Sequence, residues 1–288
     1  MTTPAVSFEF FPPKTLEASF RLWDTVQTLA PLAPRFVSVT YGAGGTTREL
    51  TRDAVGTLNK HLGLPVAAHL TCIDASRAET LAIAADFAKQ GVREIVALRG
   101  DPPKGATGFT PHPEGFKDSC ELISALAETG DFKIRVGAYP ETHPEAASGT
   151  ADLDWLKRKI DAGASEAITQ FFFEADKFLR FRDRCAAAGI TAPIIPGILP
   201  IENWAAARKF AQSCGTHVPA LLDDAFTKAA RDDRSDLLAV AQGTELCSTL
   251  LDEGVDALHF YTLNRPELTR DICHALGLTP KAALRDVA

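Results

Sequence analysis

A glutamate stands near the end of the first predicted strand, in residues 6–14 (VSFEFFPPK). Apolar and polar side chains alternate there, as in a strand with two unlike faces, and Pro12-Pro13 end it because proline lacks the N–H that a sheet needs. Glu9 therefore lies at the carboxyl end of the strand, on its less apolar face. Burying a carboxylate costs free energy unless it is paired or protonated. Two interpretations stay open: a salt bridge inside the fold, or a general acid whose pKa is raised by desolvation.

Other side chains that could do chemistry follow the ends of five further predicted strands. In chain order they are Thr40, Tyr41, His69, Arg99, Asp101, Tyr139, His143 and Gln170. If these strands end side by side, the side chains form a polar ring together with Glu9. No Ser-His-Asp order is compelling, and Cys72 has no evident base. The ring therefore favours a site that holds a cofactor.

Most members of this ring also have a purely structural interpretation. His69 could bond a neighbouring backbone group. Arg99 and Asp101 could neutralise each other, or they could hold a phosphate and face a charged ring, respectively. Gln170 is harder to explain in this way, because a buried amide needs several partners. The basic run at 157–159 is most simply a solvated helix face, although Lys159 could contact a phosphate.

The strands that carry these residues alternate with segments of helical period. We expect strands over residues 6–11, 36–40, 66–70, 95–98, 134–138, 167–171, 193–198 and 257–261. We expect helices over 15–29, 46–61, 77–90, 115–128, 150–162, 174–188, 202–213, 219–229, 235–253 and 266–276. Eight βα units in 288 residues predict an α/β fold, a single (β/α)8 TIM barrel with an extra C-terminal helix. A doubly wound sheet is the alternative.

A glycine-rich loop, GAGGTT at residues 42–47, follows the second predicted strand. It lacks the last glycine of a GxGxxG fingerprint, and it does not follow the first strand as that fingerprint should. We interpret it as a loop that approaches a phosphate or a ring at a helix N-terminus.

The composition argues against several classes of partner. A net charge of −7 without a long basic run disfavours nucleic acid and anionic membranes. No apolar run is long enough to span a bilayer, and no signal peptide is evident. The six cysteines form no CxxC pair or metal-ligand cluster, so we expect reduced thiols, no metal site and a cytoplasmic protein. We expect one domain over residues 1–288, with 281–288 as a loose tail.

Ten short segments, in this order along the chain, resemble segments of a known protein family. They are SFEFFPPKT, FVSVTYGAGG, AAHLTCID, IVALRGDPP, AYPETHPEA, DLDWLKRKIDAGA, AITQFFF, FRDRC, IIPGILPI and FYTLNR. Together they closely resemble bacterial 5,10-methylenetetrahydrofolate reductases of the MetF type, over nearly the whole chain. The resemblance implies a (β/α)8 barrel with FAD at its C-terminal face. It also implies reduction of 5,10-methylenetetrahydrofolate to 5-methyltetrahydrofolate for methionine synthesis, with NAD(P)H reducing FAD before the folate enters.

The resemblance assigns catalytic and substrate-binding roles. Glu9 would be the general acid that promotes opening of the folate's five-membered ring to a 5-iminium cation. Asp101 would stabilise that cation and tune the flavin. Substrate contacts would fall on Thr40, on Gln170 for both folate and nicotinamide, on Phe210 against either ligand, and on Arg265 near the aminobenzoyl part.

The same resemblance assigns a set of FAD contacts. They fall on Thr40, Tyr41, Ala43, His69, Arg99, Gly100, Asp101, Tyr139, His143, Ala146, Asp152, Trp155, Arg158 and Lys159. In this interpretation Arg158 and Lys159 are phosphate partners, and Trp155 is a position that we expect to vary.

One position departs from the family pattern, and three questions of function stay open. Ala206 stands where the best-known bacterial members have a glutamine that touches folate, so one hydrogen bond to the substrate would be lost. A flavin-free reductase of the same family and a non-enzymatic folate-binding barrel are the alternatives to the flavoenzyme. NADH is favoured over NADPH, and a homo-oligomer is expected.

Overall fold

The computed structural model describes residues 3–41, 48–101 and 109–280. The glycine-rich loop with Ala43 and the tail 281–288 lie outside these ranges. The strands are β1 Ala5–Phe10, β2 Phe36–Val39, β3 Val66–Thr71, β4 Glu94–Leu98, β5 Lys133–Ala138, β6 Glu166–Thr169, β7 Ile194–Ile195, β8 Gly197–Ile198 and β9 Ala257–Tyr261. No helix in the described ranges is long and apolar enough to cross a membrane.

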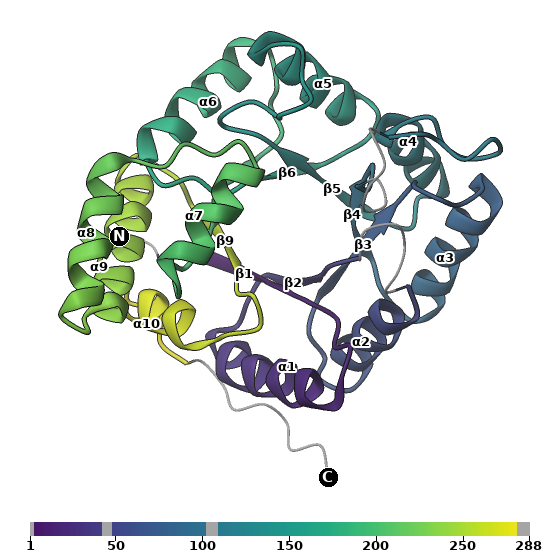
Figure 1. Ribbon diagram of the computed structural model, residues 1–288. Coiled ribbons are helices and arrows are strands. Elements are labelled where there is room, and N and C mark those ends of the chain that lie inside the picture. The colour runs from purple at the N-terminus through teal and green to yellow at the C-terminus, as the bar shows by residue number, and fades with distance from the viewer. Residues whose placement is uncertain (1–2, 42–47, 102–108, 281–288) are drawn as a thin grey trace.

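All pairings between these strands are parallel, in the order β7-β6-β5-β4-β3-β2-β1-β9-β8. Figure 1 shows the strands in a ring with helices outside them, a nearly closed α/β barrel. The predicted TIM-barrel class is confirmed. The prediction of one strand over 193–198 is wrong: Pro196 separates β7, which pairs with β6, from β8, which pairs with β9. Proline has no N–H to donate and so interrupts the ladder.

The helices follow the strands around the outside of the barrel (Figure 1). They are α1 Leu16–Leu29, α2 Arg48–Lys60, α3 Arg77–Lys89, α4 Ser119–Thr129, α5 Gly149–Asp161, α6 Ala175–Ala187, α7 Trp204–Ser213, α8 Ala220–Arg231, α9 Ser235–Asp252 and α10 Glu267–Ala275, with a short 3-10 turn η1 Ala30–Leu32. The expected start of α4 at residue 115 is wrong. Asp118 caps this helix by accepting a hydrogen bond from the Glu121 N–H, and so begins it four residues later.

The main core lies between the sheet and the helices. Val6, Phe8 and Phe10 pack there, each at most 3% exposed, while Ser7 and Glu9 face the barrel interior. A second cluster of buried residues, which includes Phe171 and Phe226, supports α7 and α8 at the rim. The alternation predicted for β1 is thus confirmed, and it aims Glu9 inward.

The base of the barrel is closed by a buried ionic cluster. Arg135 is 1% exposed and bonds both Glu94 and Glu166, and its guanidinium lies 3.7 Å from the centroid of the Phe36 ring. Glu166, which is 5% exposed as a side chain, is also paired with Arg35 and Lys133. These residues stand at the N-terminal ends of their strands, opposite the predicted site.

Candidate active site at the mouth of the barrel

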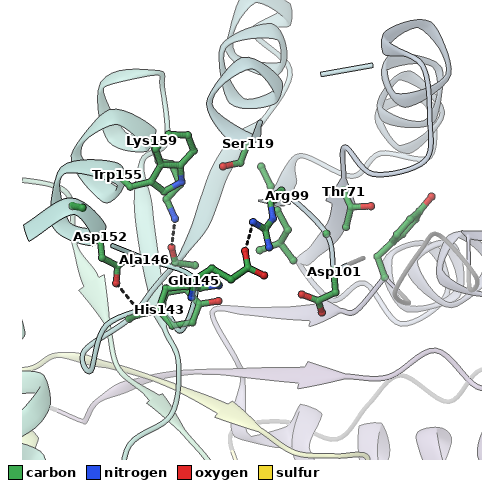
Figure 2. Close-up of a pocket in the computed structure, with 17 residues that line it drawn as sticks. Thr71, Arg99, Asp101, Ser119, His143, Glu145, Ala146, Asp152, Trp155 and Lys159 are labelled. Atoms are coloured by element: carbon green, nitrogen blue, oxygen red, sulfur yellow. Dashed lines mark hydrogen bonds and ion pairs between the residues drawn. The ribbon is translucent and has the colours of Figure 1, made fainter. Parts of the chain in front are cut away.

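A cavity of about 430 Å³ opens over the C-terminal ends of β3, β4 and β5 (Figure 2). Ten residues assigned to the cofactor by resemblance line it: Tyr41, Arg99, Gly100, Asp101, Tyr139, His143, Ala146, Asp152, Trp155 and Lys159. Residues from three strand ends and one helix therefore come together at one site. Of the predicted polar ring, Tyr41, Arg99, Asp101, Tyr139 and His143 line this cavity, and Glu9, Thr40, His69 and Gln170 do not.

Two cations stand in the wall of this cavity. Lys159 is buried, donates to the Gly137 carbonyl at 2.5 Å, and has its pKa lowered by burial to about 8. Arg99 donates to Glu145 Oε2 at 2.6 Å, and Figure 2 shows Glu145 extending from the loop after β5 to meet it. Arg99 thus pairs with Glu145, so the interpretation that it neutralises Asp101 is wrong.

The loop after β5 is held in place by its own polar groups. Asp152 Oδ2 accepts a hydrogen bond from the His143 N–H at 2.9 Å, and the Tyr139 and His143 rings meet edge to face at 4.5 Å. Burial raises the pKa of Tyr139 to about 12 and lowers the pKa of His143. These groups are therefore uncharged near neutral pH and can contact a ligand without carrying charge.

Glu9 lies apart from this cavity, inside the barrel, between two histidines. His69 Nε2 is 3.3 Å and His259 Nε2 is 3.9 Å from Glu9 Oε2, and the Glu9 side chain is 16% exposed. Neither Nε2 atom has an aligned hydrogen-bond partner in the described part of the chain. A carboxylate and two imidazoles therefore share a small, nearly dry space.

Ser7 contacts the other side of the His259 ring. The ring Nδ1 lies 2.8 Å from Ser7 Oγ, and the same hydroxyl is within hydrogen-bond reach of the Leu258 carbonyl. The one hydroxyl proton can go to either the Leu258 carbonyl or Nδ1, so Ser7 orients the ring without setting its tautomer. Burial lowers the pKa of His259, and the neighbouring Glu9 carboxylate opposes this shift without cancelling it.

The expectation that burial raises the pKa of Glu9 is wrong for the protein without ligands. Desolvation does act in that direction, but the interaction with His259 and His69 outweighs it and lowers the pKa of Glu9 from 4.5 to about 2. The partners lie 60 and 250 residues away in the sequence, so no local pattern around Glu9 could indicate them.

The remaining predicted residues lie at the rim or below it. Gln170 follows β6, and its Oε1 accepts from the Phe171 N–H at 3.1 Å. Phe210 is 46% exposed on α7 and stacks on Phe171 at 5.2 Å. Arg265 is paired with Glu202 at 2.6 Å. Gln170 follows β6, Phe210 lies on α7 and Arg265 follows β9. All three lie on the side of the mouth away from the cavity over β3 to β5.

Three residues predicted to contact the cofactor do not line the cavity. His69 lies beside Glu9, and the Thr40 carbonyl accepts a hydrogen bond from the Thr51 hydroxyl. Arg158 is exposed, and its guanidinium lies 4.5 Å from the centroid of the Trp155 ring. Lys157 pairs with Asp161 on the outer face of α5. The solvated-face interpretation therefore holds for 157 and 158, and it is wrong for the buried Lys159.

Sequence reasoning missed several residues of the site. Thr71, Ser119 and Glu145 line the cavity, and His259 completes the surroundings of Glu9. His259 lies two positions before the end of the strand predicted over 257–261, and Thr71 lies one residue beyond the strand predicted over 66–70, so continuing the strand alternation could have pointed to both. Glu145 lies in a loop, where no periodicity applies.

Comparisons with known proteins agree with this geometry. Residues 1–277 match the family model described as methylenetetrahydrofolate reductase. The 5,10-methylenetetrahydrofolate reductase of Salmonella typhimurium (strain LT2) is 48% identical over 276 residues, which cover 96% of this chain and 91% of that protein. A probable methylenetetrahydrofolate reductase (NADH) of Oryza sativa is 35% identical and covers 96% of this chain and 49% of its own length.

A solved structure shares the fold. It is an uncharacterized protein from Clostridium thermocellum that binds two copies of 5-methyl-5,6,7,8-tetrahydrofolic acid, with a TM-score of 0.60 and 15% identity, over 96% of this chain and 94% of that one. At this identity the likeness concerns the barrel alone. Because the family model spans nearly the whole chain and the similarity to the bacterial relative is of equal extent, this chain belongs to the methylenetetrahydrofolate reductase family.

Proposed function

We propose that this protein reduces 5,10-methylenetetrahydrofolate to 5-methyltetrahydrofolate with a bound FAD and a reduced nicotinamide. The observation that carries the proposal is the Glu9 cluster: a carboxylate 3.3 Å from one buried imidazole and 3.9 Å from another, at the bottom of a mouth with an adjacent polar cavity. Opening the folate's five-membered ring needs a proton delivered to a nitrogen, and this cluster can hold one.

The cavity over β3 to β5 fits FAD. Arg99 and Lys159 supply two cations for a diphosphate, and the Thr71 Oγ1 is buried there without a hydrogen-bond partner in the described ranges. Gly137 leaves open wall beneath the ligand, since an added Cβ would meet only Leu98, at 3.9 Å. When bound, FAD would accept a hydride from the nicotinamide and pass it to the folate, which is the ping-pong order.

The proton is the part of the reaction that this chain's own side chains supply. Glu9 is ionised at neutral pH, so it must take up the proton that it delivers, from solvent or from a neighbouring imidazolium, as the folate binds. When a folate covers the mouth and excludes water, desolvation of the carboxylate increases and favours the acid form of Glu9. The acid then protonates the leaving nitrogen, and the 5-iminium cation forms.

Three further side chains complete the proposed site. Asp101, exposed at the cavity rim, faces the cation that forms on the folate and stabilises it. Gln170 and Phe210 flank the open mouth and would contact the folate or the nicotinamide in turn. NADH is the proposed reductant, since the rice relative's name specifies it. A cytoplasmic homo-oligomer remains our expectation.

An absorption spectrum of the purified protein, followed by anaerobic addition of NADH and then of methylenetetrahydrofolate, tests the proposal. We expect a yellow protein that bleaches with NADH and regains its colour with the folate. A colourless protein that cannot be reconstituted with FAD would point to the flavin-free reductase. A protein that bleaches but ignores the folate would overturn the substrate and leave the flavin site.

A further inference from the structure

The Asn264 side chain joins the residue that follows β1 to the loop after β9. Asn264 Oδ1 accepts from the Phe11 N–H at 2.9 Å, and Asn264 Nδ2 donates to the Phe11 carbonyl at 2.9 Å. The backbone pairing of β1 with β9 includes Glu9 opposite Tyr261. The Asn264 carboxamide therefore pairs with the backbone of Phe11 as a strand would, two residues beyond Glu9 and after β1 has ended.

The loop that carries Asn264 has an unusual backbone. Leu263 and Asn264 both adopt left-handed conformations, with φ of 51° and 53°. Asparagine tolerates this region, but leucine does not favour it, so surrounding contacts must hold the turn. Leu263 is nevertheless 38% exposed, whereas Asn264 is 6% exposed. The unfavourable backbone conformation of Leu263 therefore exposes an apolar side chain to solvent, so burial of Leu263 does not explain why the turn has this shape.

A second set of hydrogen bonds ties the same loop to the backbone of the acid itself. Thr262 Oγ1 donates to the Glu9 carbonyl at 2.6 Å and accepts from the Asn264 N–H at 3.2 Å. Arg265, the next residue, donates its N–H to the Thr262 carbonyl at 2.9 Å. Thr262 thus links Glu9, Asn264 and Arg265 in one hydrogen-bonded unit, and the Asn264 carboxamide extends this unit to Phe11.

We propose that Asn264 is a positioning residue for folate reduction. Its carboxamide fixes the separation between the end of β1, which carries the acid, and the turn that presents Leu263 and Arg265 to the folate. The inference rests on the proposed function. Because a misplacement of about 1 Å can cost on the order of a hundredfold in rate, loss of this pairing affects the reaction that needs both elements. Hydride transfer from nicotinamide needs neither of them.

Asn264→Ala tests the proposal in the FAD-loaded protein. We expect the folate half-reaction to slow by about 10- to 100-fold, while flavin reduction by NADH stays within about twofold of wild type. Asn264→Gly, which accepts the left-handed backbone, should show the same loss if the carboxamide matters and not the strain. Asn59→Ala is the matched control, because it removes a carboxamide that donates to the Gln90 carbonyl at 3.0 Å, at the other end of the barrel.

Asn264→Asp adds a readout that a merely structural role would not move. A protonated carboxyl has one acceptor and one donor, like the carboxamide, whereas the carboxylate can only accept. We expect the folate half-reaction of this variant to approach the wild-type rate at acidic pH and to fall as the new carboxyl ionises. Parallel loss of both half-reactions in Asn264→Ala, full activity in Asn264→Gly, or a wild-type pH profile in Asn264→Asp would each overturn the inference. A wild-type protein that ignores the folate would overturn the proposed function and, with it, this role.

Discussion

Two buried glutamates, one at each end of the barrel, have partners of different kinds. Glu166 at the base is paired with Arg35, Lys133 and Arg135. Among the described residues, the ion-pair partners of Glu9 near the mouth are the imidazoles of His69 and His259. Guanidinium and ammonium groups keep their charge at all physiological pH values, whereas imidazole gains and loses its proton there. The carboxylate at the base is thus fixed as an anion, and the one at the mouth can exchange a proton with its partners.

The surroundings of the two glutamates agree with this division. The base cluster is fully paired and covers the Phe36 ring with the Arg135 guanidinium. Around Glu9, the Nε2 atoms of His69 and His259 and the hydroxyl of Ser38 all lack hydrogen-bond partners in the described part of the chain. Unsatisfied buried polar atoms cost stability, and their concentration beside one carboxylate supports the proposal that Glu9 acts on a ligand.

The largest effect should come from Glu9→Gln. Glutamine keeps the size of the side chain and cannot donate an acidic proton, so we expect the folate half-reaction to fall by about 10²- to 10⁴-fold. Flavin reduction by NADH should stay within about twofold, measured by anaerobic stopped-flow absorbance. Loss of both half-reactions together would refute the role assigned to Glu9.

Glu166→Gln should instead act on stability. The substitution leaves the Arg135 guanidinium buried with one counter-ion fewer, and breaking a buried ion pair costs about 3–5 kcal/mol. Urea denaturation followed by circular dichroism measures this loss, and the two half-reaction rates per folded molecule should be unchanged. A selective loss of folate reduction in this variant would remove the contrast between the two ends of the barrel.

His259→Asn sharpens the comparison by changing only the partner of Glu9. Asparagine cannot carry the shared proton, so we expect the folate half-reaction to slow by roughly tenfold and its pH dependence to change, as for a general acid–base partner. Because the pKa of His259 is lowered from 6.5, stopped-flow measurements between pH 5 and 7 would show the change, with exposed His274→Asn on α10 as control. An unchanged pH profile would mean that His259 only packs beside Glu9.

The smallest effect concerns stability in acid. The pKa of Glu9 is lowered from 4.5 to about 2, so the folded state binds this proton less readily than the unfolded chain. The contribution of Glu9 to stability is then present above pH 4.5 and is lost as the pH falls from 4.5 towards 2. The difference in unfolding free energy between wild type and Glu9→Gln should shrink across this window. A difference that stays constant would argue against a lowered pKa.

Strand ends were predictable from sequence, and the partners of the side chains there were not. Alternation in β1 and the proline pair after it located Glu9, and the βα order brought Arg99, Tyr139 and His143 to one cavity, whereas Asp152 on α5 was indicated only by the family resemblance. The pKa of Glu9 depends on His259, which is 250 residues distant and adjacent only because β9 closes against β1. The break of the seventh strand at Pro196 likewise depends on how the barrel closes. The Glu145–Arg99 pair depends on a loop conformation, and neither leaves a periodic pattern in the sequence.

The most direct test of the account is the protonation state of Glu9 with and without folate. An isotope-edited infrared spectrum of the oxidised, glutamate-labelled protein, which cannot reduce its substrate, would be compared before and after methylenetetrahydrofolate is added. The account predicts a protonated carboxyl band that appears on addition, is absent from Glu9→Gln and is retained in Glu166→Gln. A band that never appears, or that disappears in Glu166→Gln instead, would contradict the claim that the proton is held by the glutamate paired with histidines.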